Sequence, residues 1–166
     1  MTESLNRILV PIDFSAHSEK AIRYATTLAN KFGARLSLLH VVEDPFVTGA
    51  WQADVFAPNI PELLNDLIKA AQSRMAEHKK HLAAHGFIIE TAVSTGRPAS
   101  AIVEQASTGR FDVIVMGTHG RTGLTHALLG SVAERVVQKA PCPVLTVRDA
   151  TTVRPKVESA VTAAAV

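Results

Sequence analysis

The chain has 166 residues, a length that suits one domain with a complete hydrophobic core. Hydrophobic residues make up 47% of the chain and charged residues 19%, a composition that indicates a folded protein and excludes a disordered one. The net charge of +2 is too small to predict nucleic acid or an anionic membrane as the main partner.

Cysteine content and hydropathy further restrict the class of protein to which the chain can belong. The single cysteine, Cys142, excludes an internal disulfide framework and a site built from several thiolates. It lies between two prolines and ahead of an apolar run, which favours a partly buried hydrophobic role over a reactive thiol. No apolar stretch reaches the ~20 residues that span a bilayer, and the first residues lack the basic flank of a signal peptide. We therefore expect a cytoplasmic protein without membrane insertion.

The first part of the chain predicts a parallel crossover. Residues 7–12 form a short, β-branched apolar run that is typical of a buried strand. Ser15 is a good N-cap, and apolar residues then recur at helical spacing through 16–32. Residues 35–42 predict a second strand. Strand, helix and strand in this order indicate a right-handed parallel connection.

The middle of the chain begins with a segment of a different kind. Residues 43–61 contain prolines, a glycine and Trp51 and fit no period, so we expect a long surface loop of the sort that is often functional. Helical spacing returns over 62–85 and is ended by Gly86. Residues 87–93 then predict a third strand.

The last third continues the alternation of strands and helices. It predicts a helix at 98–107, a strand at 112–117, a glycine loop to 130, a helix at 131–139 and a strand at 143–147. This pattern predicts an α/β fold, with a single doubly wound sheet over residues 1–148. Residues 149–166 lie beyond that unit, and we expect a loosely ordered C-terminal tail.

The glycine loop is the most informative segment. It starts at the carboxyl end of a predicted parallel strand, where open α/β sheets bind ligands. Gly130 and Ser131 open a helix, and a helix amino end is a natural phosphate site. The alternative is that Gly117 and Gly120 make only a tight turn while Ser131 and Glu134 form a capping box. Spacing alone leaves both interpretations open, and the chain has no Gly-Lys-Ser/Thr of a Walker loop.

The motifs together resemble those of the universal stress protein family, over about residues 5–148. The spacing Gly117-x2-Gly120-x9-Gly130-Ser131 is similar to the ATP-binding signature of that family. Four further segments resemble strand and turn motifs of that family: residues 8–18, 95–98, 112–120 and 141–147. The resemblance implies a five-stranded parallel sheet of order 3-2-1-4-5, an adenine-nucleotide alpha hydrolase-like fold, with ATP across the carboxyl ends of the first and fourth strands.

Carried over position by position, the resemblance implies a site for ATP and Mg²⁺. The residues that it places against adenine and ribose are Pro11, Ile12, Val41, Met116 and Gly117. Those that it places against the triphosphate are His119, Gly120, Gly130, Ser131 and Val132. Asp13 would face the ribose or the metal-bound phosphates, and Arg121 either steadies phosphate charge or is a solvated loop residue. Ala133 departs from ATP-binding members that carry a hydroxyl there.

Several polar residues have simpler explanations that remain open. Asp13 could act only in the turn before the first helix. His40 ends a predicted strand, where we expect a packed or half-exposed side chain. His78, His81 and His85 share one helix face and could hold a metal, but we expect a solvated or partly packed face because no cysteine or carboxylate completes a shell.

No catalytic constellation is visible in the sequence. The function implied by the resemblance is that of an ATP-responsive regulatory module acting in stress response on an unidentified protein partner. One alternative is a slow Mg²⁺-dependent ATP hydrolase that uses Asp13, and another is an interaction protein that does not use nucleotide. The resemblance also implies a homodimer formed by antiparallel pairing of the last strands.

Overall fold

The computed structural model describes residues 4–44, 60–118 and 129–148. Its strands are β1 (Arg7–Pro11), β2 (Arg35–Glu43), β3 (Ile89–Gly96), β4 (Val113–Gly117) and β5 (Val144–Val147). Its helices are α1 (Ala16–Phe32), α3 (Ile60–Ala84), α4 (Pro98–Thr108) and α5 (Ser131–Lys139). A bilayer-spanning helix, which needs ~20 mostly apolar residues, does not occur among the residues that the structure describes.

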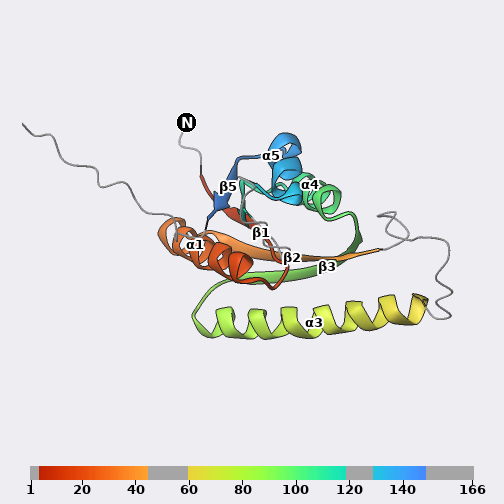
Figure 1. The fold of residues 1–166 in the computed structure, drawn as a ribbon. Helices are drawn as coiled ribbons and strands as arrows, with labels where there is room; N and C mark the ends of the chain where they lie inside the picture. The colour runs from red at the N-terminus through yellow and green to blue at the C-terminus, as the bar shows by residue number, and fades with distance from the viewer. Residues whose placement is uncertain (1–3, 45–59, 119–128, 149–166) are drawn as a thin grey trace, which may run out of the picture.

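The five strands form one parallel sheet in the order β3-β2-β1-β4-β5, which confirms the predicted fold class and strand order. From β1 the chain moves outward through β2 to β3 and then returns to β4 on the other side of β1 (Figure 1). The direction of winding therefore reverses between β1 and β4. In sheets of this kind the crevice at that reversal is where ligands bind.

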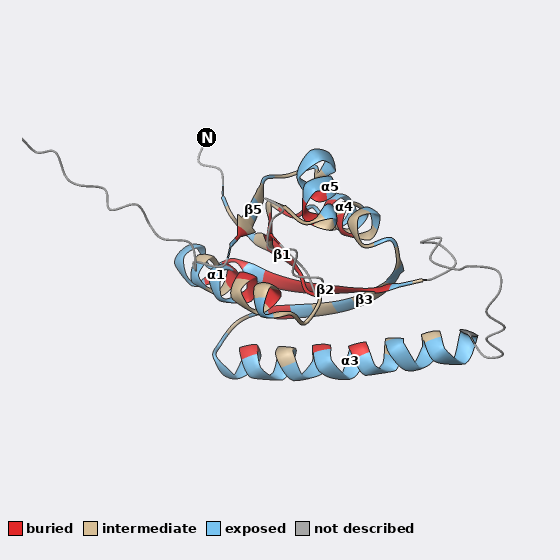
Figure 2. Ribbon diagram, viewed as in Figure 1, coloured by how far each residue is buried: buried red, intermediate tan, exposed pale blue. Residues whose placement is uncertain are grey.

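Two apolar layers sandwich the sheet. Alternate residues of β1 face opposite sides: Ile8 packs with buried residues of α1 and α3, and Leu9 packs with those of α4 and α5. Figure 2 shows the buried residues along the strands and on the sides of the helices that face them. Helix α3 is buried only in part, since Met75 is 1% exposed while Leu63 is 57% exposed. The second half of α3 therefore anchors that helix on the sheet.

Element boundaries differ from the sequence expectation at two places around α3. The helix begins at Ile60, two residues earlier than predicted, and β3 begins at Ile89 although the apolar run starts at Phe87. Gly86 has a φ of +85°, and the N–H of Phe87 donates to the Leu82 carbonyl at 3.3 Å. The start of the run therefore completes the helix end before strand pairing begins. Of the predicted loop, residues 45–59 lie outside the described ranges.

The amino ends of the central strands are fixed by one carboxylate. Asp112 Oδ2 accepts hydrogen bonds from the backbone N–H groups of Asn6 and Arg7, at 2.7 and 2.8 Å. The N–H of Asp112 in turn donates to the Arg7 carbonyl at 3.0 Å. These contacts lie at the amino ends of the strands, whereas the candidate site lies at their carboxyl ends. The start of β1 is therefore held independently of that site.

Candidate functional site

The two strands on either side of the winding reversal end side by side. Strand β1 ends at Pro11 and leads through a short turn into α1, and β4 ends at Gly117 and leads towards α5. The turn and the amino ends of both helices therefore lie at the carboxyl ends of the strands (Figure 1). This end of the sheet is where the sequence predicts the site.

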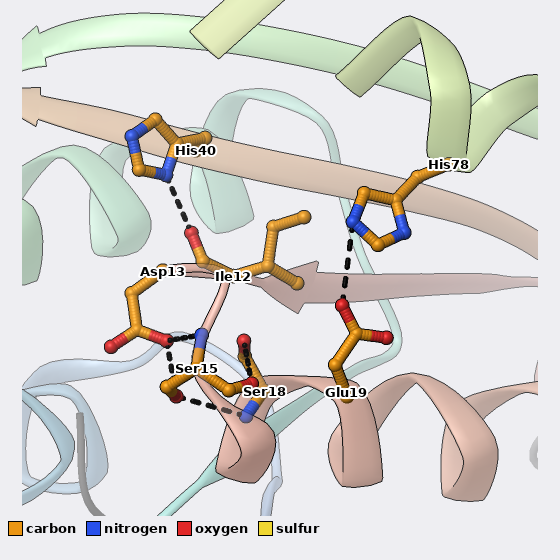
Figure 3. A network of polar contacts seen from close by, with 7 residues as sticks. All are labelled: Ile12, Asp13, Ser15, Ser18, Glu19, His40 and His78. Carbon is orange, nitrogen blue, oxygen red and sulfur yellow. Dashed lines mark hydrogen bonds and ion pairs between the residues drawn. The ribbon is translucent and has the colours of Figure 1, made fainter. Parts of the chain in front are cut away.

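The backbone of Ile12 is bonded to β2 through both its N–H and its carbonyl, and Figure 3 shows the carbonyl contact with His40. Its N–H donates to the Leu39 carbonyl at 2.8 Å. Its carbonyl oxygen lies 2.8 Å from Nδ1 of His40. Because a carbonyl can only accept, Nδ1 of His40 carries the hydrogen in this pair. The chain therefore stays attached to β2 for one residue beyond the last residue of β1.

The carboxylate of Asp13 organises the start of α1. Its Oδ1 accepts hydrogen bonds from the Ser15 N–H at 3.1 Å and from the Ser15 hydroxyl at 2.6 Å. Ser15 is the N-cap, as predicted, and its hydroxyl oxygen accepts from the Ser18 N–H at 3.3 Å. The local role that the sequence left open for Asp13 is therefore present. It also fixes the direction of the carboxylate at the amino end of α1.

Phe14 connects this turn to α3. It is one of the few non-glycine residues with a positive φ, +63°, a conformation that costs strain in an L-residue. Its ring centroid lies 4.5 Å from that of His40 and 5.9 Å from that of His78. The Arg74 guanidinium carbon lies 3.9 Å from the centre of the Phe14 ring. Nε2 of His78 lies 3.4 Å from a carboxylate oxygen of Glu19, so the same cluster also links α3 to α1.

The end of β4 packs against the first turn of α1. A Cβ atom on Gly117 would lie 3.0 Å from Cβ of His17, which leaves no room for a side chain. Thr118 follows as a buried residue whose N–H donates to the Val147 carbonyl at 3.0 Å. Its own carbonyl accepts from the Gly130 N–H at 2.7 Å. This last bond joins the two ends of the predicted glycine loop.

The N-cap residue of α5 supplies no side-chain hydrogen bond. Gly130 is the N-cap, with extended backbone angles, and Ser131 is already the first helical residue. The capping box of Ser131 and Glu134, one of two interpretations that the sequence allowed, is therefore wrong by one position. Because Gly130 has no side-chain oxygen, the first-turn N–H groups of α5 receive no acceptor from their cap. Such an end can offer its N–H groups to an anion.

The side of the predicted site that would contact adenine and ribose is lined by buried residues. Val41 and Met116 are 8% and 5% exposed, so only their edges are available to a ligand. Val41 is paired with Ser94 of β3, and its side chain packs on the α4 and α5 face. Ser94 Oγ is buried and has no hydrogen-bond partner among the described residues. An orphan hydroxyl thus lies next to the position predicted to contact adenine.

Nine of the twelve predicted site residues belong to the described part of the chain, all at this end of the sheet. They are Pro11, Ile12, Asp13, Val41, Met116, Gly117, Gly130, Ser131 and Val132. The other three, His119, Gly120 and Arg121, lie outside the described residues. Sequence reasoning missed the cluster around Phe14. The one available sequence signal was the position of His40, which in the alternation of β2 falls on the same face of the sheet as buried apolar residues of that strand.

His81 near the end of α3 contacts His85, which follows the helix. Nδ1 of His85 donates to the His81 carbonyl at 2.8 Å, and the two rings lie 4.6 Å apart. Within the described ranges no group of three His, Cys, Asp or Glu side chains could hold a metal ion. A Mg²⁺ ion at Asp13 would therefore need phosphate oxygens and water as its other ligands, which is the usual arrangement for Mg²⁺ with a nucleotide.

Comparison with known proteins gives a consistent result. The family model described as the universal stress protein family matches residues 4–148. Universal stress protein MJ0531 of Methanocaldococcus jannaschii is 40% identical over 148 residues, covering 86% of this chain and 81% of that protein. The structure of MJ0577, from the same organism, is 32% identical with a TM-score of 0.78 and covers 90% of this chain and 99% of its own. A universal stress protein solved in complex with cAMP is 24% identical with a TM-score of 0.62, covering 87% and 97%.

Proposed function

Because the chain belongs to the universal stress protein family, we propose that it binds ATP with Mg²⁺ and acts as a nucleotide-responsive regulatory module in stress response. One observation carries the proposal. The turn that holds Asp13 and the amino end of α5, whose cap Gly130 supplies no side-chain hydrogen bond, lie together at the carboxyl end of the sheet, where the winding reverses between β1 and β4. The two elements offer the carboxylate and the N–H groups that a metal-bound triphosphate requires.

The phosphates would lie at the start of α5. Backbone N–H groups of Ser131 and Val132 would meet phosphate oxygens beside Gly130, whose own N–H donates to the Thr118 carbonyl, and the positive end of the helix dipole favours that charge. The family resemblance adds His119 and Gly120 to this group, and Arg121 would steady the phosphate charge. Asp13 would face the ribose or the Mg²⁺ ion that the phosphates carry.

The adenosine part would lie across the ends of β1 and β2. Adenine would contact Val41 and the backbone of Pro11 and Ile12, and Met116 and Gly117 would line the ribose side. The family member solved with cAMP shows that an adenine nucleotide is bound in at least one protein of this fold. At 24% identity that protein is similar to this chain in fold alone, so the choice of ATP rests on the glycine signature.

Nucleotide binding would act on partners through two helices. A ligand in this position would touch the amino ends of α1 and α5 together. A protein partner that contacts either helix would therefore distinguish the bound state from the free state, provided that it binds the two states with different affinity. The proposed setting is the cytoplasm, where ATP and Mg²⁺ are supplied together.

A homodimer through β5 is part of the same proposal. Strand β5 is at the edge of the sheet, and Leu145 on it is 39% exposed. An edge strand with an exposed apolar side chain is a site for pairing with another strand. Antiparallel pairing of two β5 strands would give a closed two-fold dimer.

Calorimetric titration of the nucleotide-free protein with Mg-ATP tests the proposal, with AMP as the comparison ligand and Gly120→Val as the binding-site variant. We expect saturable ATP binding that is weaker with AMP and lost in the variant. Phosphate release measured in the same samples decides whether bound ATP is hydrolysed. Absence of ATP binding by the unaltered chain would refute the proposal and favour an interaction protein that does not use nucleotide.

A further inference from the structure

Asp13 lies between two residues that are both held by His40. On its amino side, the Ile12 carbonyl accepts a hydrogen bond from Nδ1 of His40 at 2.8 Å (Figure 3). On its carboxyl side, the Phe14 ring packs against the same imidazole in a tilted arrangement, with the centroids 4.5 Å apart and the ring planes at 36°. One side chain therefore holds the two neighbours of the proposed metal-facing carboxylate.

His40 is well placed to impose this arrangement on the turn. The residue is only 8% exposed, and its neighbours Leu39 and Val41 are buried in the opposite layer of the core. Its ring is thus held by strand β2, and the turn adapts to it. A hydrogen bond made in so buried a place is strong, and a partner left without it is costly.

The backbone at Phe14 shows that the turn needs such support. Its φ of +63° is strained for a residue with a side chain, and this strain must be offset by the contacts of the ring. These contacts come from His40 on β2 and from Arg74 and His78 on α3. Loss of these ring contacts would remove what offsets the strain at Phe14, the residue next to Asp13.

We propose that His40 is a positioning residue of the nucleotide site, which aims the Asp13 carboxylate at the metal-bound phosphates by holding Ile12 and Phe14. This inference rests on the proposed function and extends it to a residue that the sequence did not place in the site. The hydrogen bond requires the hydrogen on Nδ1, which both the neutral tautomer with the hydrogen on Nδ1 and the imidazolium form provide.

Three substitutions separate the two contacts of His40. His40→Asn keeps an N–H donor near the position of Nδ1 and loses the ring. His40→Phe keeps a ring for Phe14 and loses the donor, and His40→Leu loses both. Leu36→Val is the matched control, because Leu36 is fully buried towards the other end of β2, where it pairs with Ile8 near the start of β1.

Mg-ATP affinity is measured by calorimetry for each folded variant, together with the urea midpoint. We expect His40→Leu to weaken binding about tenfold, as loss of a buried hydrogen bond and its packing predicts. We expect His40→Asn and His40→Phe each to recover part of that loss. Leu36→Val should lower the midpoint and leave the affinity unchanged. Nitrogen NMR of the unaltered protein should show the hydrogen of His40 on Nδ1.

Two results would overturn the inference while the proposed function stands. One is unchanged affinity in His40→Leu when the unaltered protein binds ATP. The other is a loss of affinity in Leu36→Val that matches its loss of stability, since His40 would then act only through the fold. If the unaltered protein does not bind Mg-ATP, the proposed function fails and this inference fails with it. Should His40→Leu not fold, His40→Asn and His40→Phe carry the same comparison.

Discussion

Gly117 at the end of β4 lies directly against His17 in the first turn of α1. A Cβ atom on Gly117 would be 3.0 Å from Cβ of His17 and 3.1 Å from its carbonyl carbon. Contacts this short are tighter than carbon atoms normally make, so only glycine fits without displacement. The absence of a side chain at 117 therefore brings the amino end of α1 next to β4 at the centre of the proposed site.

Gly117→Ala should lower stability because the new methyl group must push α1 away from β4. We expect a loss of about 1–3 kcal/mol in the free energy of unfolding, typical of an overpacked site, and a larger loss for Gly117→Val. Urea denaturation measures it, and Mg-ATP titration should show weaker binding. Gly33→Ala is the control: no atom lies within 4 Å of the new methyl group, and its φ of +68° adds strain far from the site. Equal ATP affinities in the two variants would contradict the role given to this contact.

Asp13→Asn separates the charge of Asp13 from its role in the turn. The amide oxygen can still accept from the Ser15 N–H and hydroxyl, so we expect a loss of stability of only about 0.3–1 kcal/mol, from the helix dipole. Affinity for Mg-ATP should fall about tenfold, because the neutral side chain is a poor partner for the metal. In EDTA the variant should bind ATP at least as well as the unaltered chain, since carboxylate and phosphate repel each other. A tenfold loss that persists in EDTA would show that Asp13 does not act through the metal.

The sequence predicted the elements well where periodicity and end signals agree. Helix α1 occupies the predicted residues 16–32, because Ser15 caps it and Gly33 ends it in the left-handed conformation. The strand order followed from the family resemblance. Helix α5 also occupies the predicted residues 131–139, but its cap is not the one that the Ser131 and Glu134 pattern suggests. Gly130 is the cap, because its backbone is extended and its carbonyl accepts the first helical bond, from the Glu134 N–H.

The cluster around Phe14 could not have been predicted from spacing. Its members come from the turn after β1, from β2 and from the middle of α3, so only the fold brings Phe14, His40 and Arg74 together. A positive φ at a phenylalanine is also against local preference. Tertiary contacts outweigh that preference here. The proposed function of the turn depends on contacts that are distant in sequence.

Ser94→Ala should stabilise the unliganded protein. The Ser94 hydroxyl is buried and has no hydrogen-bond partner among the described residues, and a buried group without a partner costs about 1–3 kcal/mol. Removing it should raise the free energy of unfolding by about 1 kcal/mol. Thermal and urea denaturation of the nucleotide-free protein measure the change. A loss of stability in this variant would mean that the hydroxyl has a hydrogen-bond partner, so that its removal does not raise the free energy of unfolding.

Cys142 should be a slowly reacting thiol. Partial burial raises the pKa of Cys142, and the negative charge of Asp112 raises it further, because both disfavour the thiolate. The folded protein should therefore react with iodoacetamide more slowly than the urea-unfolded chain from roughly pH 7 to 9. The raised pKa favours the folded state below the unfolded value of about 8.5, and this contribution is lost as the pH rises through the folded value. Asp112→Asn should move the rate profile towards lower pH, and an unchanged profile would exclude the carboxylate as a cause.

Leu145→Lys should separate the proposed dimer. Leu145 is 39% exposed on the edge strand β5, and paired β5 strands would bring two lysines together in the place of two apolar side chains. Light scattering after gel filtration at micromolar concentration should give the mass of two chains for the unaltered protein and of one chain for the variant. Ile88→Lys is the matched control, since Ile88 is 62% exposed beside β3 at the opposite edge and should leave the dimer intact. A single-chain mass for the unaltered protein would refute the dimer, and dissociation by both lysines would show that added charge, and not the β5 edge, causes the change.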